Sequence, residues 1–287
     1  AMYLAKSEMT GVVIYDAEKD PHSSKRLSMM SELGGAIRDN QLRLHFQPKI
    51  DLAGGACYGC EALLRWQHPQ LGFVSPGEFI PIAEMTNLIH PMTRWVLEES
   101  MQMCRQWHAC GYPLSVAVNL SARNLLDENL PRLVEKLLDE YGLPAWALEL
   151  ELTESSIMTD PRRAMITMER LHALGVTLSI DDFGTGYSSL AYLKRLPVQT
   201  LKIDYSFVRD MLEDEQDEII VNSTIHLAHN LGLDVVAEGV ETKAVLERLK
   251  GLGCDRCQGF HIARPMPSDR LFDWLQQSRS GKAESRS

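Results

Sequence analysis

The stretch Ser179-Ile180-Asp181-Asp182-Phe183-Gly184-Thr185-Gly186 places two adjacent carboxylates at the end of an expected strand, before a loop with two glycines. Neighbouring carboxylates repel each other, and burying even one without a partner costs on the order of several kcal/mol. Asp and Gly are also ordinary turn residues, so the pair by itself indicates either a solvated turn or a site for bound cations. What the other strands carry favours the cation site.

Strand-like and helix-like segments alternate on both sides of this stretch. Only Ala53-Gly54-Gly55 separates the first two expected strands, which leaves no room for a crossover helix and predicts an antiparallel pair. Strands are expected at residues 42–52, 57–66, 114–120, 147–152, 177–182, 200–205, 234–238 and 255–260. Helices are expected at about 27–40, 77–87, 92–110, 130–141, 161–174, 188–195, 215–231, 243–252 and from 269 onward.

This alternation predicts an α/β fold with a mostly parallel sheet. Eight strands in about 240 residues predict a closed TIM-type (β/α)8 barrel with the first strand antiparallel to the rest. An open doubly wound sheet is the alternative. No Gly-x-Gly-x-x-Gly follows the first strand and the sequence contains no P-loop, which disfavours that alternative and a nucleotide cofactor with it.

The composition is that of a soluble globular chain, with 287 residues of which 45% are hydrophobic and 24% charged. The net charge of −10 and the lack of clustered Lys and Arg argue against binding to a nucleic-acid polymer. No apolar run approaches the roughly 18 residues of a membrane span, and the first residues do not resemble a signal peptide. We therefore expect a cytoplasmic location and no membrane contact within this chain, although the parent protein could be anchored upstream.

Four of the six cysteines form two Cys-x-x-Cys pairs, Cys57 with Cys60 and Cys254 with Cys257. Zinc sites use this spacing. Both pairs lie in or beside strand-like segments, where residues three apart point to opposite faces of a sheet. We therefore expect packing thiols, without a zinc ion or a disulfide.

Polar residues recur at or near the ends of the expected strands. In a barrel, the carboxyl ends of the strands surround one mouth, and sites are built there. A single polar residue at the end of a strand is ordinary and needs no functional role, but several at corresponding positions on most of the strands indicate a site. These residues are Glu61, on the same face as Leu63 and Arg65, and Asn119, Glu151, Asp181, Asp182, Lys202, Glu238 and Gln258.

The ligand types indicate the class of metal. Carboxylates and a carboxamide, with no Cys or His among them, are hard oxygen donors that suit Mg²⁺ or Mn²⁺ rather than zinc. Two such ions, with Asp181 as a bridging ligand, would bracket a phosphoryl group and activate water, as in phosphodiester hydrolysis. Arg65 and Lys202 would add the positive charge that an acidic protein must concentrate locally.

Seven short motifs carry these residues. They are Glu61-Ala62-Leu63-Leu64-Arg65-Trp66, Asn119-Leu120-Ser121, Glu151-Leu152-Thr153-Glu154, Asp181-Asp182-Phe183-Gly184-Thr185-Gly186, Lys202-Ile203-Asp204, Ala237-Glu238-Gly239-Val240-Glu241 and Gln258-Gly259-Phe260. Together they resemble the motif set of the EAL-domain cyclic di-GMP phosphodiesterases, over about residues 28–275. The fold of that family, a TIM-type barrel with its first strand reversed, agrees with the hairpin inferred above.

The resemblance implies a role for each matching residue, and none of the family's catalytic positions is altered. It implies catalytic roles for Glu61, Glu238 and Lys202, with Lys202 orienting the water. The implied ligands of the two metals are Glu61, Asn119, Glu151, Asp181, Asp182 and Glu238. The implied substrate contacts are Gln47, Leu63, Arg65, Asp182 and Gln258. The loop after the fifth strand is implied to be coupled to dimerisation through Glu154 and Glu241. Glu149 also faces inward, so spacing alone leaves it as an alternative to Glu151, which the motif favours.

The first residues, from Ala1 to Asp16, resemble the last helix and strand of a GGDEF-type diguanylate cyclase domain. The expected organisation is a remnant of an upstream domain at 1–18, a linker at 19–27, the EAL-type barrel at 28–277 and a disordered tail at 278–287. The resemblance implies a homodimer.

Three functions are compatible with these observations. The first is a phosphodiesterase that opens cyclic di-GMP to linear pGpG with Mg²⁺ or Mn²⁺, while Ca²⁺ binds without supporting turnover. The second is a receptor that binds the dinucleotide without cutting it, and the intact metal ligands argue against this. The third is an unrelated barrel enzyme, such as an aldolase, for which no Schiff-base lysine or strand-end histidine is apparent.

Overall fold

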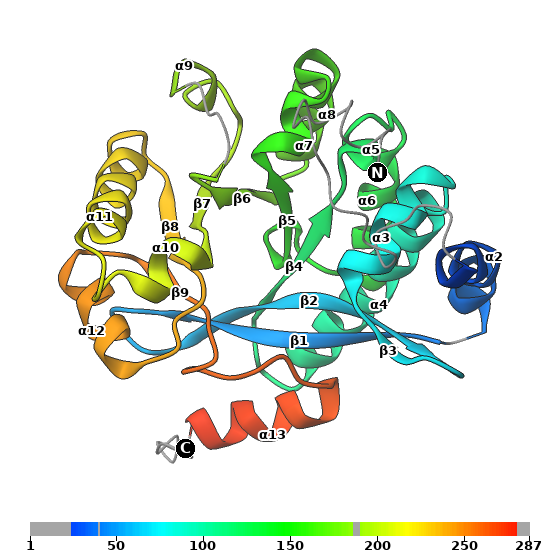
Figure 1. Cartoon of the computed structure of the whole chain (residues 1–287), viewed down its shortest axis with the longest axis horizontal. Helices are drawn as coiled ribbons and strands as arrows, with labels where there is room; N and C mark the ends of the chain where they lie inside the picture. Colours follow the sequence, from blue (N-terminus) through cyan, green and yellow to red (C-terminus); the bar gives the residue numbers. More distant parts are fainter. Residues whose placement is uncertain (1–23, 40, 186–189, 280–287) are drawn as a thin grey trace.

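The computed structural model describes residues 24–39, 41–185 and 190–279, and their strands form one sheet rolled into a barrel (Figure 1). The strand order is β1-β9-β8-β7-β6-β5-β4-β2-β3, and a further pairing of β1 with β2 closes it. β1 runs antiparallel to both neighbours, whereas β2 and the strands from β4 to β9 pair in parallel. The predicted α/β barrel with a reversed first strand is confirmed. The strands are β1 (Leu42–Asp51), β2 (Cys57–His68), β3 (Gly72–Val74), β4 (Ser115–Leu120), β5 (Leu148–Thr153), β6 (Thr177–Phe183), β7 (Thr200–Ile203), β8 (Asp234–Ala237) and β9 (Arg256–Cys257).

Helices surround the barrel, and the last of them, α13, lies against β1 below the barrel in the view of Figure 1. None of the helices in the described ranges is long and apolar enough to cross a bilayer. The helices are α2 (Ser24–Arg38), α3 (Pro76–Met85), α4 (Ile89–Ala109), α5 (Ala122–Leu125), α6 (Leu130–Tyr141), α7 (Glu154–Met158), α8 (Pro161–Ala173), α9 (Leu190–Leu193), α10 (Tyr205–Asp210), α11 (Glu215–Asn230), α12 (Lys243–Gly251) and α13 (Ser268–Arg279), with a 3-10 turn at Ala145–Ala147.

The alternation of β1 explains which side chains line the barrel interior. Phe46 points outward and is buried under the helices, where its ring meets that of Trp107 in α4 edge-on at 5.1 Å between centroids. Gln47 and Lys49, one and three residues further on, belong to the opposite face of the strand and are buried inside the barrel. The reversed strand therefore contributes polar side chains to the interior.

The helix boundaries follow the local signals in the sequence. The side chain of Asp160 accepts a hydrogen bond from the backbone N–H of Arg163, and Pro161 is the first residue of α8. Gly142 ends α6 in the left-handed conformation, with φ of 63°. Both predicted boundaries are confirmed.

Two strands are shorter than predicted. β7 ends at Ile203 because Asp204 caps a helix that the sequence did not predict, α10, by accepting a hydrogen bond from the N–H of Ser206. β9 ends at Cys257, where the backbone approaches the 238–240 loop. A Cβ added to Gly259 would lie 2.2 Å from the backbone of Val240, so only glycine permits this approach.

The predicted domain limits are only partly covered by the described residues. α2 begins at Ser24, so the end of the predicted linker 19–27 is helical, and α13 extends through Arg279 into the predicted tail 278–287. The predicted remnant at 1–18 and the start of the predicted helix at 188–195 lie outside the described residues.

The expectation that Cys57 and Cys60 point to opposite faces is wrong. The register between β1 and β2 shifts between Lys49 and Ile50, which leaves Tyr58 as an extra residue and interrupts the alternation of the strand. The two thiols interact, and the hydrogen bond from Cys60 lowers the pKa of Cys57. All six cysteines are free thiols in the structure.

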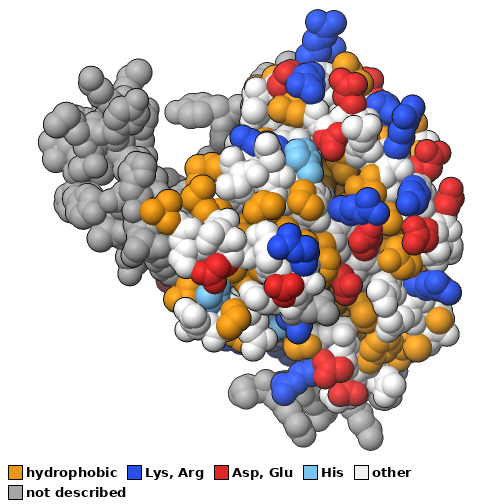
Figure 2. Space-filling view, turned by 90° about the vertical axis from the view of Figure 1, so that its right-hand side faces the viewer, with side chains coloured by type: hydrophobic (Ala, Val, Ile, Leu, Met, Phe, Trp, Pro, Cys, Tyr) orange, Lys and Arg blue, Asp and Glu red, His pale blue; other side chains and the backbone are white. Residues whose placement is uncertain are grey.

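On the face drawn in Figure 2, Lys and Arg side chains lie among Asp and Glu side chains rather than gathering in one area. A nucleic-acid polymer is bound through clustered positive charge. This face therefore offers no footprint for such a polymer among its described residues.

Candidate active site

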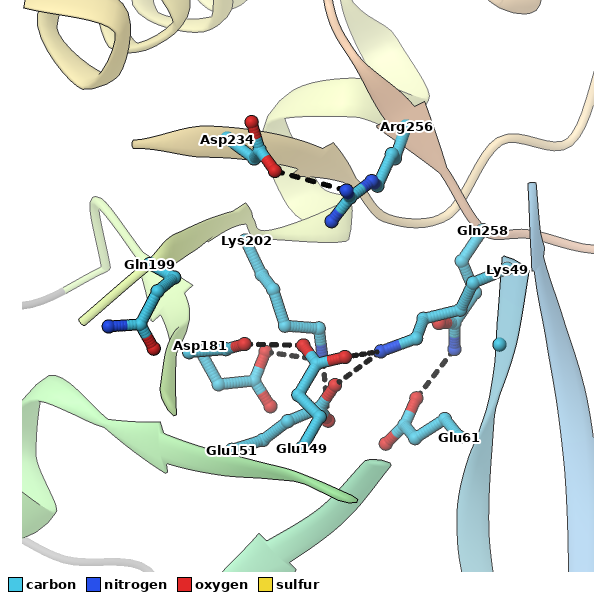
Figure 3. A network of polar contacts seen from close by, with 12 residues as sticks. Lys49, Glu61, Glu149, Glu151, Asp181, Gln199, Lys202, Asp234, Arg256 and Gln258 are labelled. Carbon is cyan, nitrogen blue, oxygen red and sulfur yellow. Dashed lines mark hydrogen bonds and ion pairs between the residues drawn. The ribbon is translucent and has the colours of Figure 1, made fainter. Parts of the chain in front are cut away.

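Lys202 occupies the centre of the barrel mouth, where β5, β6, β7 and β8 end (Figure 3). Its Nζ lies 2.8 Å from Oε2 of Glu151, 2.9 Å from Oδ1 of Asp181 and 2.8 Å from Oε1 of Glu238. The side chain is fully buried. Burial opposes its charge, but the three carboxylates outweigh burial and raise the pKa of Lys202 well above its ordinary value. Lys202 is therefore a fixed cation.

Asp181 and Asp182 face the same site although they are adjacent in a strand. The pairing of β6 with β7 is irregular between Ile180 and Phe183, and Asp182 adopts a left-handed backbone with φ of 53°. This bulge replaces the usual alternation, which would send the two side chains to opposite faces. One oxygen each from Asp181, Asp182 and Glu238 lies within 4.8 Å of the others.

Burial, together with crowding of negative charge, disfavours ionisation in this cluster. Burial and the charges of Asp181 and Asp204 raise the pKa of Asp182 to about 6. Burial also raises the pKa of Glu238 well above its ordinary value, against the opposing charge of Lys202. Additional positive charge in such surroundings would favour the ionised carboxylates.

Glu61 holds a second group of side chains beside the cluster. Its Oε1 accepts a hydrogen bond from Nδ2 of Asn119 at 2.7 Å, and its Oε2 accepts one from Nε2 of Gln258 at 2.5 Å. The same amide nitrogen of Gln258 also contacts Oε1 of Gln47 at 3.0 Å. Burial raises the pKa of Glu61 to about 6. The buried Oε1 of Gln258 finds no hydrogen-bond partner among the described residues.

A second buried lysine lies deeper in the barrel than Lys202. Nζ of Lys49 is 2.6 Å from Oε2 of Glu149 and 3.2 Å from Oε1 of Glu151, and Ser179 donates a hydrogen bond to the other oxygen of Glu149. Although burial raises the pKa of Glu151, Lys202 and Lys49 together lower it. Glu149 and Glu151 are thus each engaged on both oxygens, so these contacts do not choose between them, and Glu151 as the ligand stays a prediction from the motif.

The structure brings the predicted metal ligands together at one mouth but leaves other predicted residues at its edge. Arg65 is half-buried, and its Nη1 donates to the carbonyl of Leu64 at 2.9 Å, while Leu63 is partly buried. Glu154 begins α7 and borders a small pocket of about 20 Å³, whose apolar lining comes mostly from α7 and α9. Glu241 is exposed in the loop after β8.

Sequence reasoning missed Lys49, Ser179 and Asp204 and left the place of Glu149 open. The alternation that put Gln47 inside the barrel also predicts Lys49 there, two residues further along the same face. No comparable signal marks Ser179, whose hydroxyl matters only because Glu149 lies on the neighbouring strand, at the position paired with Thr177. Such contacts depend on the register between strands.

The donor set fits divalent cations. The described cluster offers the carboxylates of Glu61, Glu149, Glu151, Asp181, Asp182 and Glu238 and the two ammonium groups of Lys49 and Lys202. If all are ionised, four negative charges remain, which two divalent cations would balance. The ligand atoms are oxygens, which Mg²⁺ and Mn²⁺ prefer.

A mostly parallel barrel whose strands end in carboxylates around a buried lysine defines an α/β-barrel protein with an acidic site at its carboxyl mouth. The family model of the EAL domain matches residues 30–265, and the chain belongs to the EAL domain family. The fold and the resemblance predicted from the sequence are thereby confirmed.

Two relatives from Pseudomonas aeruginosa illustrate the similarity. The protein named bifunctional diguanylate cyclase/cyclic di-GMP phosphodiesterase MucR is 43% identical over 274 residues, which are 95% of this chain and 40% of the relative. The cyclic di-GMP phosphodiesterase NbdA is 44% identical over 258 residues, which are 90% of this chain and 33% of the relative. The chain spans less than half the length of these curated relatives.

Solved structures show the same similarity. A structure of the PaMucR phosphodiesterase in complex with c-di-GMP is 45% identical, with a TM-score of 0.82 and coverage of 85% of this chain and 99% of that chain. The FimX EAL domain from Pseudomonas aeruginosa, bound to c-di-GMP, is 29% identical, with a TM-score of 0.77 and coverage of 83% of this chain and 96% of that chain.

Proposed function

We propose that this chain hydrolyses cyclic di-GMP to linear pGpG with the help of two divalent cations, and so lowers the level of a bacterial second messenger. The observation that carries the proposal is the excess of buried negative charge around Lys202, because such a cluster is costly unless cations bind to it. Relatives that share over 40% identity are named cyclic di-GMP phosphodiesterases.

The oxygen donors that would hold the cations are Glu61, Asn119, Glu151, Asp181, Asp182 and Glu238. Bound there, divalent cations would lower the pKa of a water molecule and polarise the phosphodiester. The residues of the chain have their own tasks in this scheme. Lys202 orients Glu151, Asp181 and Glu238 and would orient the attacking water by giving up one of its three carboxylate contacts once the cations hold these ligands, while Glu238 or Glu61 would accept the proton that this water loses.

Arg65, Leu63, Gln47, Asp182 and Gln258 are the proposed substrate contacts. The guanidinium of Arg65 can pair with a phosphate oxygen, because Arg presents a planar fork of donors. The unpartnered Oε1 of Gln258 can accept a hydrogen bond from a ligand N–H or from water. Leu63 would add an apolar contact.

A cyclic di-GMP receptor that does not cut its ligand is the second candidate. The FimX EAL domain is described as bound to c-di-GMP, which supports binding as a property of similar barrels. An aldolase-type mechanism is disfavoured, because a Schiff-base lysine must lose its proton and the pKa of Lys202 is raised instead.

The remaining features of the proposal concern the whole protein. We propose a homodimer, with Glu154 and Glu241 coupling the loop after β6 to the dimer contact, and a cytoplasmic location. We propose that residues 1–18 are the end of a GGDEF-type domain, followed by a linker and the barrel at 28–277. Mg²⁺ or Mn²⁺ is the proposed cofactor.

The test is to incubate the metal-stripped protein with cyclic di-GMP and Mg²⁺, Mn²⁺ or Ca²⁺ and to separate the products. We expect pGpG with Mg²⁺ and Mn²⁺, and binding with little product with Ca²⁺, because the larger ion aligns water and phosphate less well. Tight binding without product under all conditions would support the receptor instead. Full activity in excess chelator would contradict metal dependence.

A further inference from the structure

Lys49 reaches across the barrel interior from the reversed strand β1 to two carboxylates of β5 (Figure 3). Its side chain has 0% exposure, so its charge is neutralised by these contacts and not by water. The ring of Tyr58 lies 5.7 Å from Nζ, and the guanidinium of Arg256 covers the same ring at 4.4 Å from its centroid. Lys49 is therefore confined on several sides.

The Glu151 carboxylate is held between two ammonium groups. Lys49 contacts Oε1 at 3.2 Å from β1, and Lys202 contacts Oε2 at 2.8 Å from β7. Two contacts on different oxygens fix the rotation of a carboxylate plane as well as its position, whereas one contact leaves the plane free to turn. Lys202 alone would leave the plane of Glu151 undetermined.

The same ammonium group also engages Glu149, the neighbouring carboxylate on β5. Glu149 has one oxygen 2.6 Å from Nζ of Lys49 and accepts a hydrogen bond from Ser179 at the other. Without Lys49, Glu149 would be a buried and uncompensated carboxylate close to Glu151. Such a group would compete with Glu151 for a cation.

We propose that Lys49 is a positioning residue of the metal site, which orients Glu151 toward the cations and keeps Glu149 out of their coordination. This inference rests on the proposed function. The reversed strand β1 thereby contributes to the site. It supplies the ammonium group of Lys49, which contacts the oxygen of Glu151 that Lys202 does not contact. Partners of this kind fix the orientation of metal ligands, and their loss typically costs about 10- to 100-fold in metal affinity or activity.

The test compares Mn²⁺ binding by the intact chain without substrate, measured by the electron paramagnetic resonance signal of free Mn²⁺. Lys49→Met alone removes a positive charge, which by simple electrostatics would strengthen cation binding. The double variant Lys49→Met/Glu149→Gln removes one positive and one negative charge. The net charge is therefore unchanged, and neither Lys49 nor Glu149 remains as a buried charge without the other. We expect the double variant to fold and to bind Mn²⁺ about 10- to 100-fold more weakly than the parent.

Ser179→Ala is the matched control, because it removes one hydrogen bond from the same cluster and leaves both Lys49 contacts in place. We expect its Mn²⁺ affinity to stay within about threefold of the parent. Kinetics at saturating Mn²⁺ provide a second readout, in which the double variant is expected to lower kcat with little change in KM for cyclic di-GMP, since Lys49 does not reach the substrate.

Parental Mn²⁺ affinity in the double variant would overturn the proposal in favour of simple charge balance. An equal loss of Mn²⁺ affinity in Ser179→Ala would overturn it as well, because the loss would then not be specific to the Lys49 contacts. So would a double variant that is unfolded by circular dichroism, because Lys49 would then be needed for folding rather than for positioning the metal ligands. Failure of the proposed function would be seen in the parent instead, as a protein that neither binds Mn²⁺ nor cuts cyclic di-GMP.

Discussion

Nζ of Lys202 lies 2.8 Å from Oε1 of Glu238, and this ion pair joins the ends of β7 and β8 at the mouth of the barrel. Glu238 also lies close to Asp181 and Asp182, so one carboxylate faces both a fixed cation and two further anions. Burial raises the pKa of Glu238 well above its ordinary value, against the opposing charge of Lys202. A bound cation would favour the ionised form.

The first prediction concerns the charge of Glu238. Glu238→Gln keeps the shape of the side chain but removes a cation ligand and an acceptor for the proton of the attacking water. We expect kcat to fall by about 100-fold or more, roughly 3 kcal/mol, while the affinity for cyclic di-GMP changes far less. Single-turnover hydrolysis and calorimetric binding measure the two quantities. The exposed Glu247→Gln is the control, and a Glu238 variant that cuts at the parental rate would remove this residue from the site.

The second prediction concerns Arg65, at the edge of the mouth. A guanidinium that grips a phosphate acts in the ground state and in the transition state alike, so its loss should weaken binding without slowing bound substrate. We expect Arg65→Ala to raise KM by about 10- to 100-fold, consistent with one charged hydrogen-bonded contact, and to leave kcat within about threefold. The exposed Arg132→Ala on α6 should change neither. An unchanged KM with a collapsed kcat would contradict the assignment.

The barrel and most of its mouth could be predicted because both depend on local patterns. Alternation within β1, the short link to β2 and the helix between each later pair of strands fix the topology. The adjacent Asp181 and Asp182 could be assigned to one site from their place at the end of a strand, although strict alternation would separate them. The bulge at Asp182 restores them to one side.

Contacts across the barrel could not be predicted in this way. Whether Lys49 meets Glu149, Glu151 or neither depends on the tilt and stagger of strands that are not neighbours in the sheet. The interaction of Cys57 with Cys60 depends on a bulge that no residue type in the sequence predicts. Contacts that are set by the register between strands or by a bulge are therefore not indicated by the local sequence.

The third prediction is that the four cysteines of the two Cys-x-x-Cys pairs bind no structural zinc. Burial raises the pKa of Cys254 and Cys257 to about 12, and a zinc ligand must be a thiolate. Elemental analysis of the purified protein should find no zinc that depends on these residues. One zinc per chain that disappears in Cys254→Ser would show the prediction to be wrong.

The last prediction is a pH dependence of cation binding and stability. The pKa values of Glu61 and Asp182 are raised to about 6, so in the metal-free protein these groups favour folding while protonated, and that stability is lost as pH rises through 6. Cations need the ionised groups. We therefore expect Mn²⁺ affinity, and the rise in Tm that Mn²⁺ produces, to increase from pH 5 to pH 7 and then level off. Asp182→Asn, which tolerates the left-handed backbone, should flatten this dependence. Calorimetric titration and thermal unfolding across this range measure both, and an Mn²⁺ affinity that is constant from pH 5 to pH 7 would show that these carboxylates are not ligands.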